Sequence, residues 1–122
     1  MNLNSILIGS ENPEALAAFY RKLFGEPVWN EGGYTTWILG SGAVTVGQHS
    51  EVKGRNDTPG RLIWNIETDD VKAEAERFKA AGATVIAEPY SFESEPGSWI
   101  ATFEDPDGNY FQLTTPMTQP ES

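Results

Sequence analysis

The chain has 122 residues, of which 39% are hydrophobic and 21% charged, and a formal net charge of -10. This composition is typical of one soluble globular domain, which at this length buries about two-thirds of the surface of the unfolded chain. The negative charge disfavours nucleic acids and anionic membranes as partners, because clustered Lys and Arg bind phosphate, and it weakly favours a cationic ligand.

Two further classes are excluded by what the sequence lacks. Without cysteine there is no disulfide, thiolate nucleophile or cysteine-bound metal. No apolar run is long enough to span a bilayer, and no basic leader precedes an apolar run, so we expect a cytoplasmic location.

The first half of the chain predicts a strand, a helix and three more strands. Apolar residues from Leu3 to Ile8 indicate the first strand. The helix is capped by Asn12 or Ser10, has Pro13 in its first turn, and ends at Gly25. The three following strands are expected at residues 27–29, 34–39 and 43–48.

A polar segment, Ser50 to Gly60, separates the two halves of the chain. It carries charges, Asn, Pro and two glycines with almost no apolar residue. This composition predicts a linker or a mobile loop.

The second half repeats the order of the first. A strand at residues 62–66 is followed by a helix from Val71 to Ala81, with Asp69 and Asp70 at its N-terminus and Gly82 as its stop. A strand at residues 84–87 and a hairpin complete it. The pattern predicts an α+β protein of two modules, at about residues 3–49 and 61–115, within one domain spanning residues 1–122.

The hairpin is the segment FEDPDGNYFQL, from Phe103 to Leu113. Pro106 and Gly108 favour a tight turn, Asn109 tolerates positive φ, and the carboxylates of Asp105 and Asp107 can accept nearby backbone N–H groups. Alternating residues on both sides indicate two half-buried strands.

The order of elements, together with FYRKLFG (Phe19 to Gly25), FKAAGA (Phe78 to Ala83) and FEDPDGNYFQL, resembles the vicinal oxygen chelate superfamily. That superfamily includes glyoxalase I, extradiol dioxygenases, fosfomycin-resistance enzymes and bleomycin-binding proteins. The resemblance covers about residues 3 to 115. It implies two βαβββ modules whose mixed sheets curl around a cleft, usually completed by a homodimer, and in many members a divalent metal held by four His or Glu ligands.

The resemblance assigns the four ligand positions to Ser5, Val46 (or Thr45), Ile63 and Gln112. None of these side chains is the imidazole or carboxylate that zinc, nickel, manganese or iron needs here. We therefore predict no cofactor and no catalytic metal.

His49 and Glu67 are the weak metal candidates. His49 is the only histidine, and it either coordinates metal, acts as a general base, or is simply solvated at a strand end. The alternative function is therefore a metal-dependent lyase of glyoxalase I type, or a dioxygenase, that uses unorthodox ligands such as His49, Glu67 and Gln112. Acid–base chemistry without metal is a further enzymatic alternative.

Aromatic residues suggest a ligand-binding cleft, although the same rings can equally fill the core or a dimer seam. We expect Trp37 and Trp99, rather than Trp29, to face the cleft. Asn65, Gln48 and Gln112 supply orienting hydrogen bonds. The predicted cleft residues are Ser5, Trp37, Val46, Gln48, Ile63, Asn65, Trp99, Phe103 and Gln112.

An acidic protein with an aromatic cleft resembles the bleomycin-binding members, which sequester a cationic antibiotic with an aromatic tail and confer antibiotic resistance. Four glutamates supply a negative rim to the cleft or belong to a solvated surface: Glu67, Glu93, Glu95 and Glu104. The predicted function is the binding of a small aromatic or cationic organic molecule by a homodimer. A purely structural or regulatory dimer is the remaining alternative.

Overall fold

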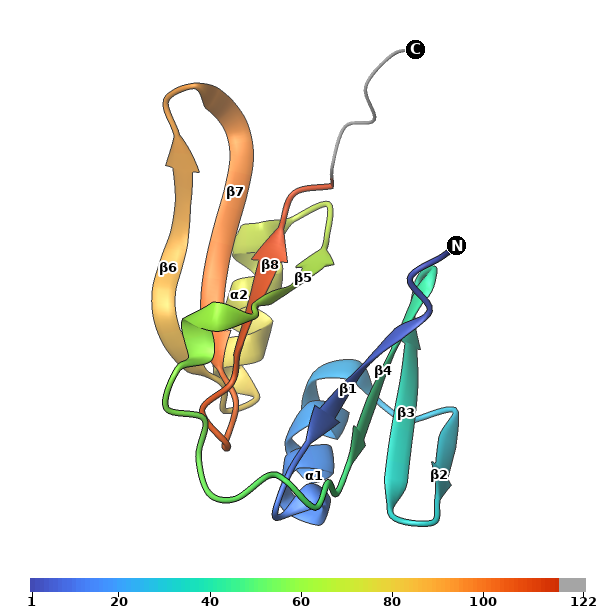
Figure 1. The fold of residues 1–122 in the computed structure, drawn as a ribbon. Coiled ribbons are helices and arrows are strands. Elements are labelled where there is room, and N and C mark those ends of the chain that lie inside the picture. The colour runs from blue at the N-terminus through green and yellow to red at the C-terminus, as the bar shows by residue number, and fades with distance from the viewer. Residues whose placement is uncertain (117–122) are drawn as a thin grey trace. The chain divides into compact units, whose positions relative to one another are not determined.

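The computed structural model describes residues 1–116. The chain divides into two compact units, one ending at Asp57 and the other beginning at Thr58, and each unit holds one helix and one four-stranded sheet (Figure 1). The boundary between the units falls inside the predicted linker. The α+β class and the two βαβββ modules are confirmed.

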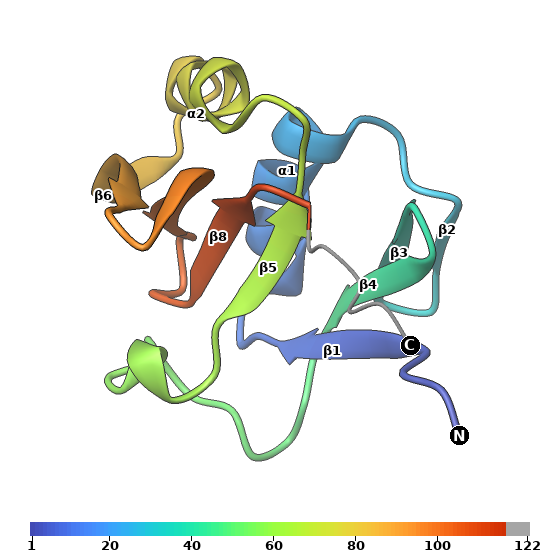
Figure 2. The same ribbon diagram turned by 90° about the horizontal axis from the view of Figure 1, so that it is seen from above.

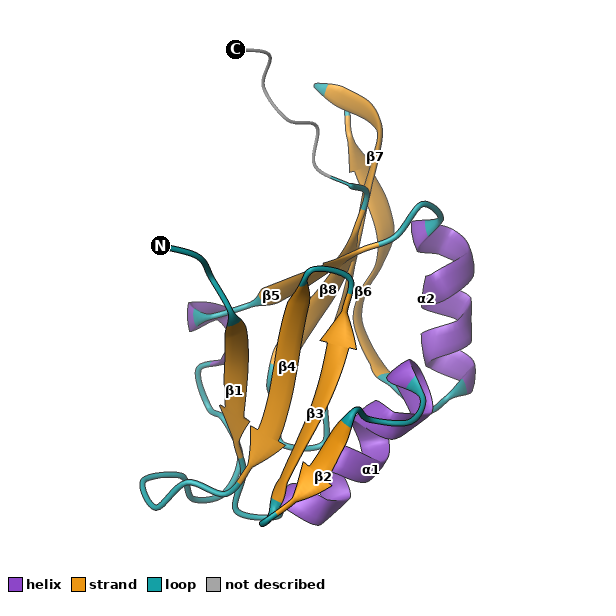
Figure 3. Ribbon diagram, turned by 90° about the vertical axis from the view of Figure 1, so that its right-hand side faces the viewer, coloured by secondary structure: helices purple, strands orange, loops and turns teal. Residues whose placement is uncertain are grey.

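The first unit is built from one helix and four strands. Its sheet has the order β1-β4-β3-β2, with β1 parallel to β4 and the other pairs antiparallel. Figure 3 shows α1 lying against one face of this sheet. The elements are β1 (Ser5–Gly9), α1 (Pro13–Phe24), β2 (Trp29–Glu31), β3 (Tyr34–Leu39) and β4 (Gly42–Gly47).

The helix α1 begins with Pro13 and ends at Gly25, as the sequence predicts. Gly25 has φ of +84° and its N–H bonds to the carbonyl of Arg21 at 2.8 Å, which closes the last turn. Neither predicted cap forms: Asn12 is the N-cap residue but makes no side-chain cap bond, and Ser10 Oγ instead accepts the N–H of Asn12 at 2.9 Å.

Trp37 on β3 fixes α1 to the first sheet. Its indole packs edge-on against Tyr20 and Phe24, and its Nε1–H donates to the carbonyl of Gly25 at 2.9 Å. The same helix face buries Leu16. The core of the first unit therefore lies between α1 and one face of the sheet.

The second unit repeats this plan with the sheet order β5-β8-β7-β6. The β5–β8 pair is parallel and the other two pairs are antiparallel. In Figure 1 the β6–β7 hairpin extends beyond β5 and β8, and Figure 2 shows α2 end-on beside the sheet. The elements are a 3₁₀ turn η1 (Pro59–Arg61), β5 (Trp64–Glu67), α2 (Val71–Ala80), β6 (Thr84–Phe92), β7 (Glu95–Glu104) and β8 (Tyr110–Thr114).

The ends of α2 are set by local bonds. Asp70 accepts the N–H of Ala73 at 3.1 Å as N-cap. At the other end Ala83 N–H reaches the carbonyl of Phe78 and Gly82 N–H reaches that of Lys79, both at 3.0 Å, with Gly82 at φ +104°. This Schellman pattern satisfies carbonyls that the helix itself leaves open.

Asp105 organises the turn between β7 and β8. Its carboxylate accepts the backbone N–H groups of Asp107 at 2.9 Å and Asn109 at 3.0 Å, while Gly108 alone takes positive φ in this turn, at +85°. The carboxylate is 3% exposed. The turn is therefore held from inside by a buried carboxylate, and Asn109 does not need the positive φ that its residue type allows.

Several strand boundaries differ from the prediction: the first strand begins at Ser5 rather than Leu3, and the strand expected from Leu62 begins at Trp64. The strand expected at residues 27–29 lies at Trp29–Glu31, and the one expected at 84–87 continues to Phe92. This longer strand contains Pro89, which is tolerated because β6 is an edge strand with bulges. None of the helices within residues 1–116 has the length and apolarity needed to cross a membrane.

Candidate functional site

The two faces of the first sheet are distinguished by its pairing register. Trp37 lies opposite Val44, and Thr36 lies opposite Thr45 on the other face, where their hydroxyls are 2.8 Å apart. Because directly paired residues share a face, Val46 lies with Trp37 on the side of α1. We call the side that carries Thr36 and Thr45 the open face of the first sheet.

Two predicted cleft residues need correction. Trp37 and Val46 are only 2% and 1% exposed and belong to the core beneath α1. Thr45, the neighbour of Val46, faces the open side. Trp29, which was not expected to face the cleft, lies on the open face instead. It pairs with Thr36 and is 55% exposed.

The open face of the first sheet is largely apolar. It carries exposed Leu7, Trp29, Tyr34 and Ile38, and the exposed polar residue Ser5 at the start of β1. Glu31 is the single charged residue in the four strands of this sheet. The predicted site residue Ser5 is therefore accessible, among apolar neighbours.

The α2 side of the second sheet contains two other predicted cleft residues. Phe103 is fully buried, packed on Phe78 and Phe111, so its assignment to the cleft is corrected to the core. Trp99 is half-buried, and the ammonium group of Lys72 on α2 lies 3.8 Å from its ring centroid. A cation of the chain itself thus occupies this face of Trp99.

A polar row crosses the open face of the second sheet. Asn65 on β5 pairs with Gln112 on β8, which pairs in turn with Thr102 on β7. Gln112 Nε2–H donates to Thr102 Oγ1 at 2.9 Å, and Thr102 is 7% exposed. Asn65 is exposed, and its side chain has no hydrogen-bond partner within the part of the chain that the structure describes. We call these three residues the amide row.

Carboxylates flank the amide row. Glu67 follows Asn65 by two residues on β5, and Glu104 lies opposite Tyr110 on the same face. The four strands of this sheet contain no Lys, Arg or His. The other two predicted rim residues, Glu93 and Glu95, are exposed at the tip of the β6–β7 hairpin, away from the row.

Thr102 is the member of the amide row that the sequence interpretation missed. Since Glu104 pairs with Tyr110 across the turn, the residue two positions earlier must pair with Gln112. The symmetry of the hairpin about the Asp-Pro-Asp-Gly turn was the signal that could have identified it. Ile63, another predicted site residue, is half-buried and immediately precedes β5.

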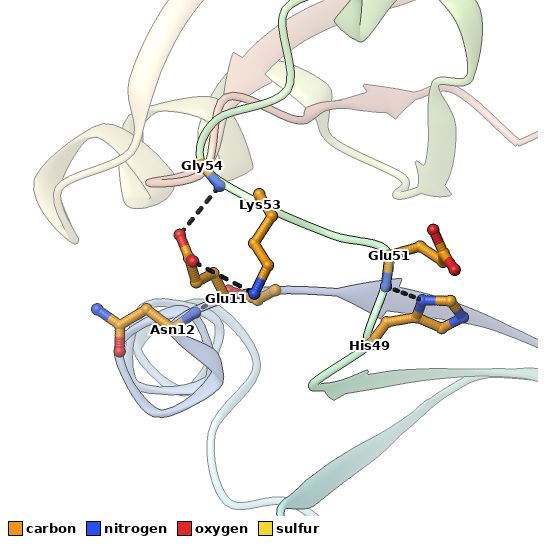
Figure 4. A network of polar contacts seen from close by, with 7 residues as sticks. Glu11, Asn12, His49, Glu51, Lys53 and Gly54 are labelled. Atoms are coloured by element: carbon orange, nitrogen blue, oxygen red, sulfur yellow. Dashed lines mark hydrogen bonds and ion pairs between the residues drawn. The ribbon is translucent and has the colours of Figure 1, made fainter.

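His49 belongs to a separate polar network in the first unit (Figure 4). Its Nδ1 accepts the backbone N–H of Glu51 at 3.1 Å, so the neutral ring carries its proton on Nε2. Gln48 beside it is exposed, and its carbonyl lies 3.5 Å from the hydroxyl of Tyr34. Both residues therefore lie at the C-terminal end of β4.

The segment 49–54, at the start of the predicted linker, is attached to the first unit by polar contacts. Glu11 Oε1 accepts the N–H of Gly54 at 3.1 Å, and its Oε2 lies 3.8 Å from Lys53 Nζ (Figure 4). Val52 N–H bonds back to the carbonyl of His49 at 3.1 Å. We call this segment the anchored loop.

The residues do not fit a catalytic metal of the superfamily's kind. Of the four ligand positions that the resemblance assigns, Ser5 and Gln112 carry a hydroxyl and an amide, Val46 is buried beside Thr45, and Ile63 is apolar. Within residues 1–116 no group of three or more His, Cys, Asp or Glu side chains is arranged to hold a metal ion. Neutral hydroxyls and amides are poor ligands for zinc or iron.

The fold recurs in known structures. A glyoxalase-related enzyme from Fulvimarina pelagi is 19% identical with a TM-score of 0.76, over 100% of this chain and 93% of that one. A glyoxalase/bleomycin resistance protein/dioxygenase family enzyme from Burkholderia phytofirmans PsJN is 22% identical with a TM-score of 0.74, over 96% and 100%. These likenesses define the class of fold.

Sequence comparison identifies the family. The sequence-family model of the glyoxalase-like domain matches residues 5–114. An uncharacterized protein of Mycolicibacterium smegmatis is 29% identical over 85 residues, which are 70% of this chain and 71% of that protein. The chain belongs to the glyoxalase-like domain family, and the predicted membership of the vicinal oxygen chelate superfamily is confirmed.

Proposed function

We propose that this protein binds a small aromatic or cationic organic molecule and does so without a catalytic metal. The observation that carries the proposal is the amide row. The bond from Gln112 to Thr102 fixes the Gln112 amide and leaves its carbonyl oxygen available as an acceptor. Asn65 adds a second amide with both donor and acceptor capacity.

The charges around the row favour ligands that donate hydrogen bonds. Glu67 is an exposed carboxylate on this face, and the chain carries a net charge of -10. An amine, amidine or guanidine group would meet acceptors there, whereas a carboxylate or phosphate would meet like charge.

The metal-dependent alternative has weaker support. A lyase or dioxygenase of this superfamily needs several imidazole or carboxylate ligands, and none of the four positions that the resemblance assigns to ligands carries one. His49 is the only imidazole in the chain, and its Nδ1 already accepts a backbone N–H.

The proposal is tested by purifying the protein without chelators and identifying small molecules that co-purify, using native mass spectrometry. We expect an organic molecule to be released on denaturation, and Gln112→Ala and Asn65→Ala to carry markedly less of it. Asn4→Ala, which changes an exposed amide outside the strands, is the control and should retain the molecule.

Metal analysis of the same preparation decides the alternative. We expect neither stoichiometric metal nor stabilisation above about 1 kcal/mol in thermal scans with zinc, nickel, manganese or iron. One tightly held ion per chain would refute the proposal.

A further inference from the structure

Gly47, at the end of β4, is a glycine that the backbone does not require. It is absent from the residues with positive φ, so any amino acid could adopt its conformation. Glycine inside a strand weakens the strand, because it loses more conformational freedom on folding and offers no side chain for packing. The reason for a glycine here must therefore lie in the space that a side chain would occupy.

That space is filled by the ring of Tyr34. A Cβ atom added at Gly47 would overlap the ring atoms Cδ1 and Cε1 of Tyr34, and would lie 3.1 Å from Cγ. The hydroxyl of Tyr34 reaches the carbonyl of Gln48 at 3.5 Å. The Cδ1–Cε1 edge of the ring thus packs against the backbone of β4, and Tyr34 remains 40% exposed.

The surroundings of Tyr34 on the open face are acidic on one side. Glu31 lies directly opposite Tyr34 on β2 and is exposed. No ion pair involving Glu31 occurs in the described part of the chain, residues 1–116. Trp29, 55% exposed, lies two residues before Glu31 on the same face.

The anchored loop borders the other side. Gly9 on β1 pairs with Gly47, and a Cβ added at Gly9 would meet Val52 Cγ2 at 3.0 Å and His49 Cβ at 3.1 Å. Two adjacent strands therefore carry glycines at this level, one covered by Tyr34 and the other by the anchored loop. Because Glu11 holds that loop, its edge is fixed (Figure 4).

We infer that the ring of Tyr34, resting on Gly47 and flanked by Glu31, is a stacking platform for a flat aromatic cation. This inference rests on the proposed function, because it assigns a ligand of the same class to a surface that lies within the first unit. A cation over a tyrosine face is attracted by the ring's quadrupole, and a neighbouring carboxylate adds Coulombic attraction. A ring already fixed by packing loses little freedom when a ligand stacks on it.

The probe for the test is proflavine, a planar tricyclic cation whose fluorescence anisotropy reports binding. We expect wild-type protein to bind it, and Tyr34→Ala to bind about tenfold more weakly because one aromatic stacking partner is lost. Tyr34→Phe should bind within about twofold of wild type, since the ring remains. Glu31→Gln should weaken binding at low salt more than at high salt.

Gly47→Ala and Gly42→Ala form a matched pair on one strand. Neither glycine has positive φ, and an added Cβ at Gly42 meets nothing within 4 Å. We expect Gly47→Ala to displace the ring and weaken proflavine binding severalfold, and Gly42→Ala to bind like wild type. In NMR spectra the Hα protons of Gly47 should give cross-relaxation peaks with the ring protons of Tyr34, which tests the geometry without any ligand.

Failure of the platform and failure of the proposed function give different results. If proflavine binds Tyr34→Ala as tightly as wild type while Gln112→Ala loses it, the platform is refuted and the proposed function stands. The second outcome is that the wild type binds none of three probes: proflavine, neutral 2-naphthol and anionic anilinonaphthalene sulfonate. If in addition no molecule co-purifies, both the platform and the proposed function are refuted.

Discussion

Single residues in this chain carry more than one structural role, and Trp37 is the clearest case. Its ring fills the space between α1 and the first sheet, and its Nε1–H satisfies the carbonyl of Gly25 where the helix ends. A helix C-terminus leaves carbonyls without intrahelical partners, so this bond stabilises the end of α1. The indole therefore combines packing with a capping function.

We expect Trp37→Phe to lower the free energy of unfolding by about 1–2 kcal/mol, through the lost hydrogen bond and the smaller ring. Trp29→Phe is the control: that residue is 55% exposed, and the change should stay within about 0.5 kcal/mol. Urea denaturation followed by circular dichroism measures both. Equal effects of the two substitutions would contradict the assignment of Trp37 to the core.

Glu74 on α2 has a lowered pKa, mainly because Arg77 donates two hydrogen bonds to its carboxylate at 2.7 and 2.8 Å. A carboxylate whose folded pKa is lowered stabilises the fold above its unfolded pKa, and the stabilisation is lost as pH falls through the folded value. We expect Arg77→Ala to be slightly less stable than wild type at neutral pH. The difference in stability between the two proteins should disappear in acid. Thermal unfolding at several pH values measures this difference, and a difference that stays constant with pH would contradict the assignment.

At the scale of elements, local chemistry determines the helices. Pro13, Gly25, Asp70 and Gly82 begin or end the two helices in both the sequence interpretation and the structure. The faces of the strands were harder to predict, because adjacent residues point to opposite sides and the side that a helix covers depends on distant pairing. Trp37 and Val46 were placed on the wrong face for this reason.

The site shows the same division. Asn65 and Gln112 were predicted as ligand-binding residues, and the structure brings them into one row because β5 and β8 are paired in parallel. Whether they bind a ligand remains a prediction. The sequence could not predict why residue 47 is a glycine. A Cβ at this position would overlap the ring of Tyr34, and the two residues come together only when β3 and β4 pair.

Gly82 tests the end of α2. Its φ of +104° is strained for residues with a Cβ, so we expect Gly82→Ala to destabilise by about 1–2 kcal/mol. Gly60→Ala in η1 is the control, because that glycine has no positive φ and nothing lies near an added Cβ. Chemical denaturation measures both, and a neutral Gly82→Ala would show that the Schellman turn tolerates a side chain.

The anchored loop can be tested by limited proteolysis. We expect Glu11→Ala to remove both contacts of the carboxylate and to increase tryptic cleavage after Lys53 severalfold. Glu11→Gln, which keeps an acceptor for Gly54 N–H, should have a smaller effect. Glu14→Ala, at an exposed position in the first turn of α1, is the control. Equal cleavage rates in all four proteins would show that Glu11 does not hold the loop.

At the scale of the whole molecule, we propose a homodimer, as the superfamily resemblance implies. Both units expose large apolar side chains, among them Leu7 and Ile38 in the first and Ile86 and Phe92 in the second. Exposed large apolar side chains of this kind favour association. Light scattering after gel filtration should give a mass twice that of the 122-residue chain, independent of concentration in the micromolar range. A monomer mass would refute the proposal.

Pro89 has a consequence for how this chain behaves at high concentration. A long edge strand that displays apolar side chains is a template for fibril growth, since its free backbone groups invite another strand. Pro89 removes one N–H donor in the middle of β6, and the neighbouring bulges break its regular repeat. Pro89 and the bulges of β6 therefore disfavour the addition of strands from other molecules at this edge.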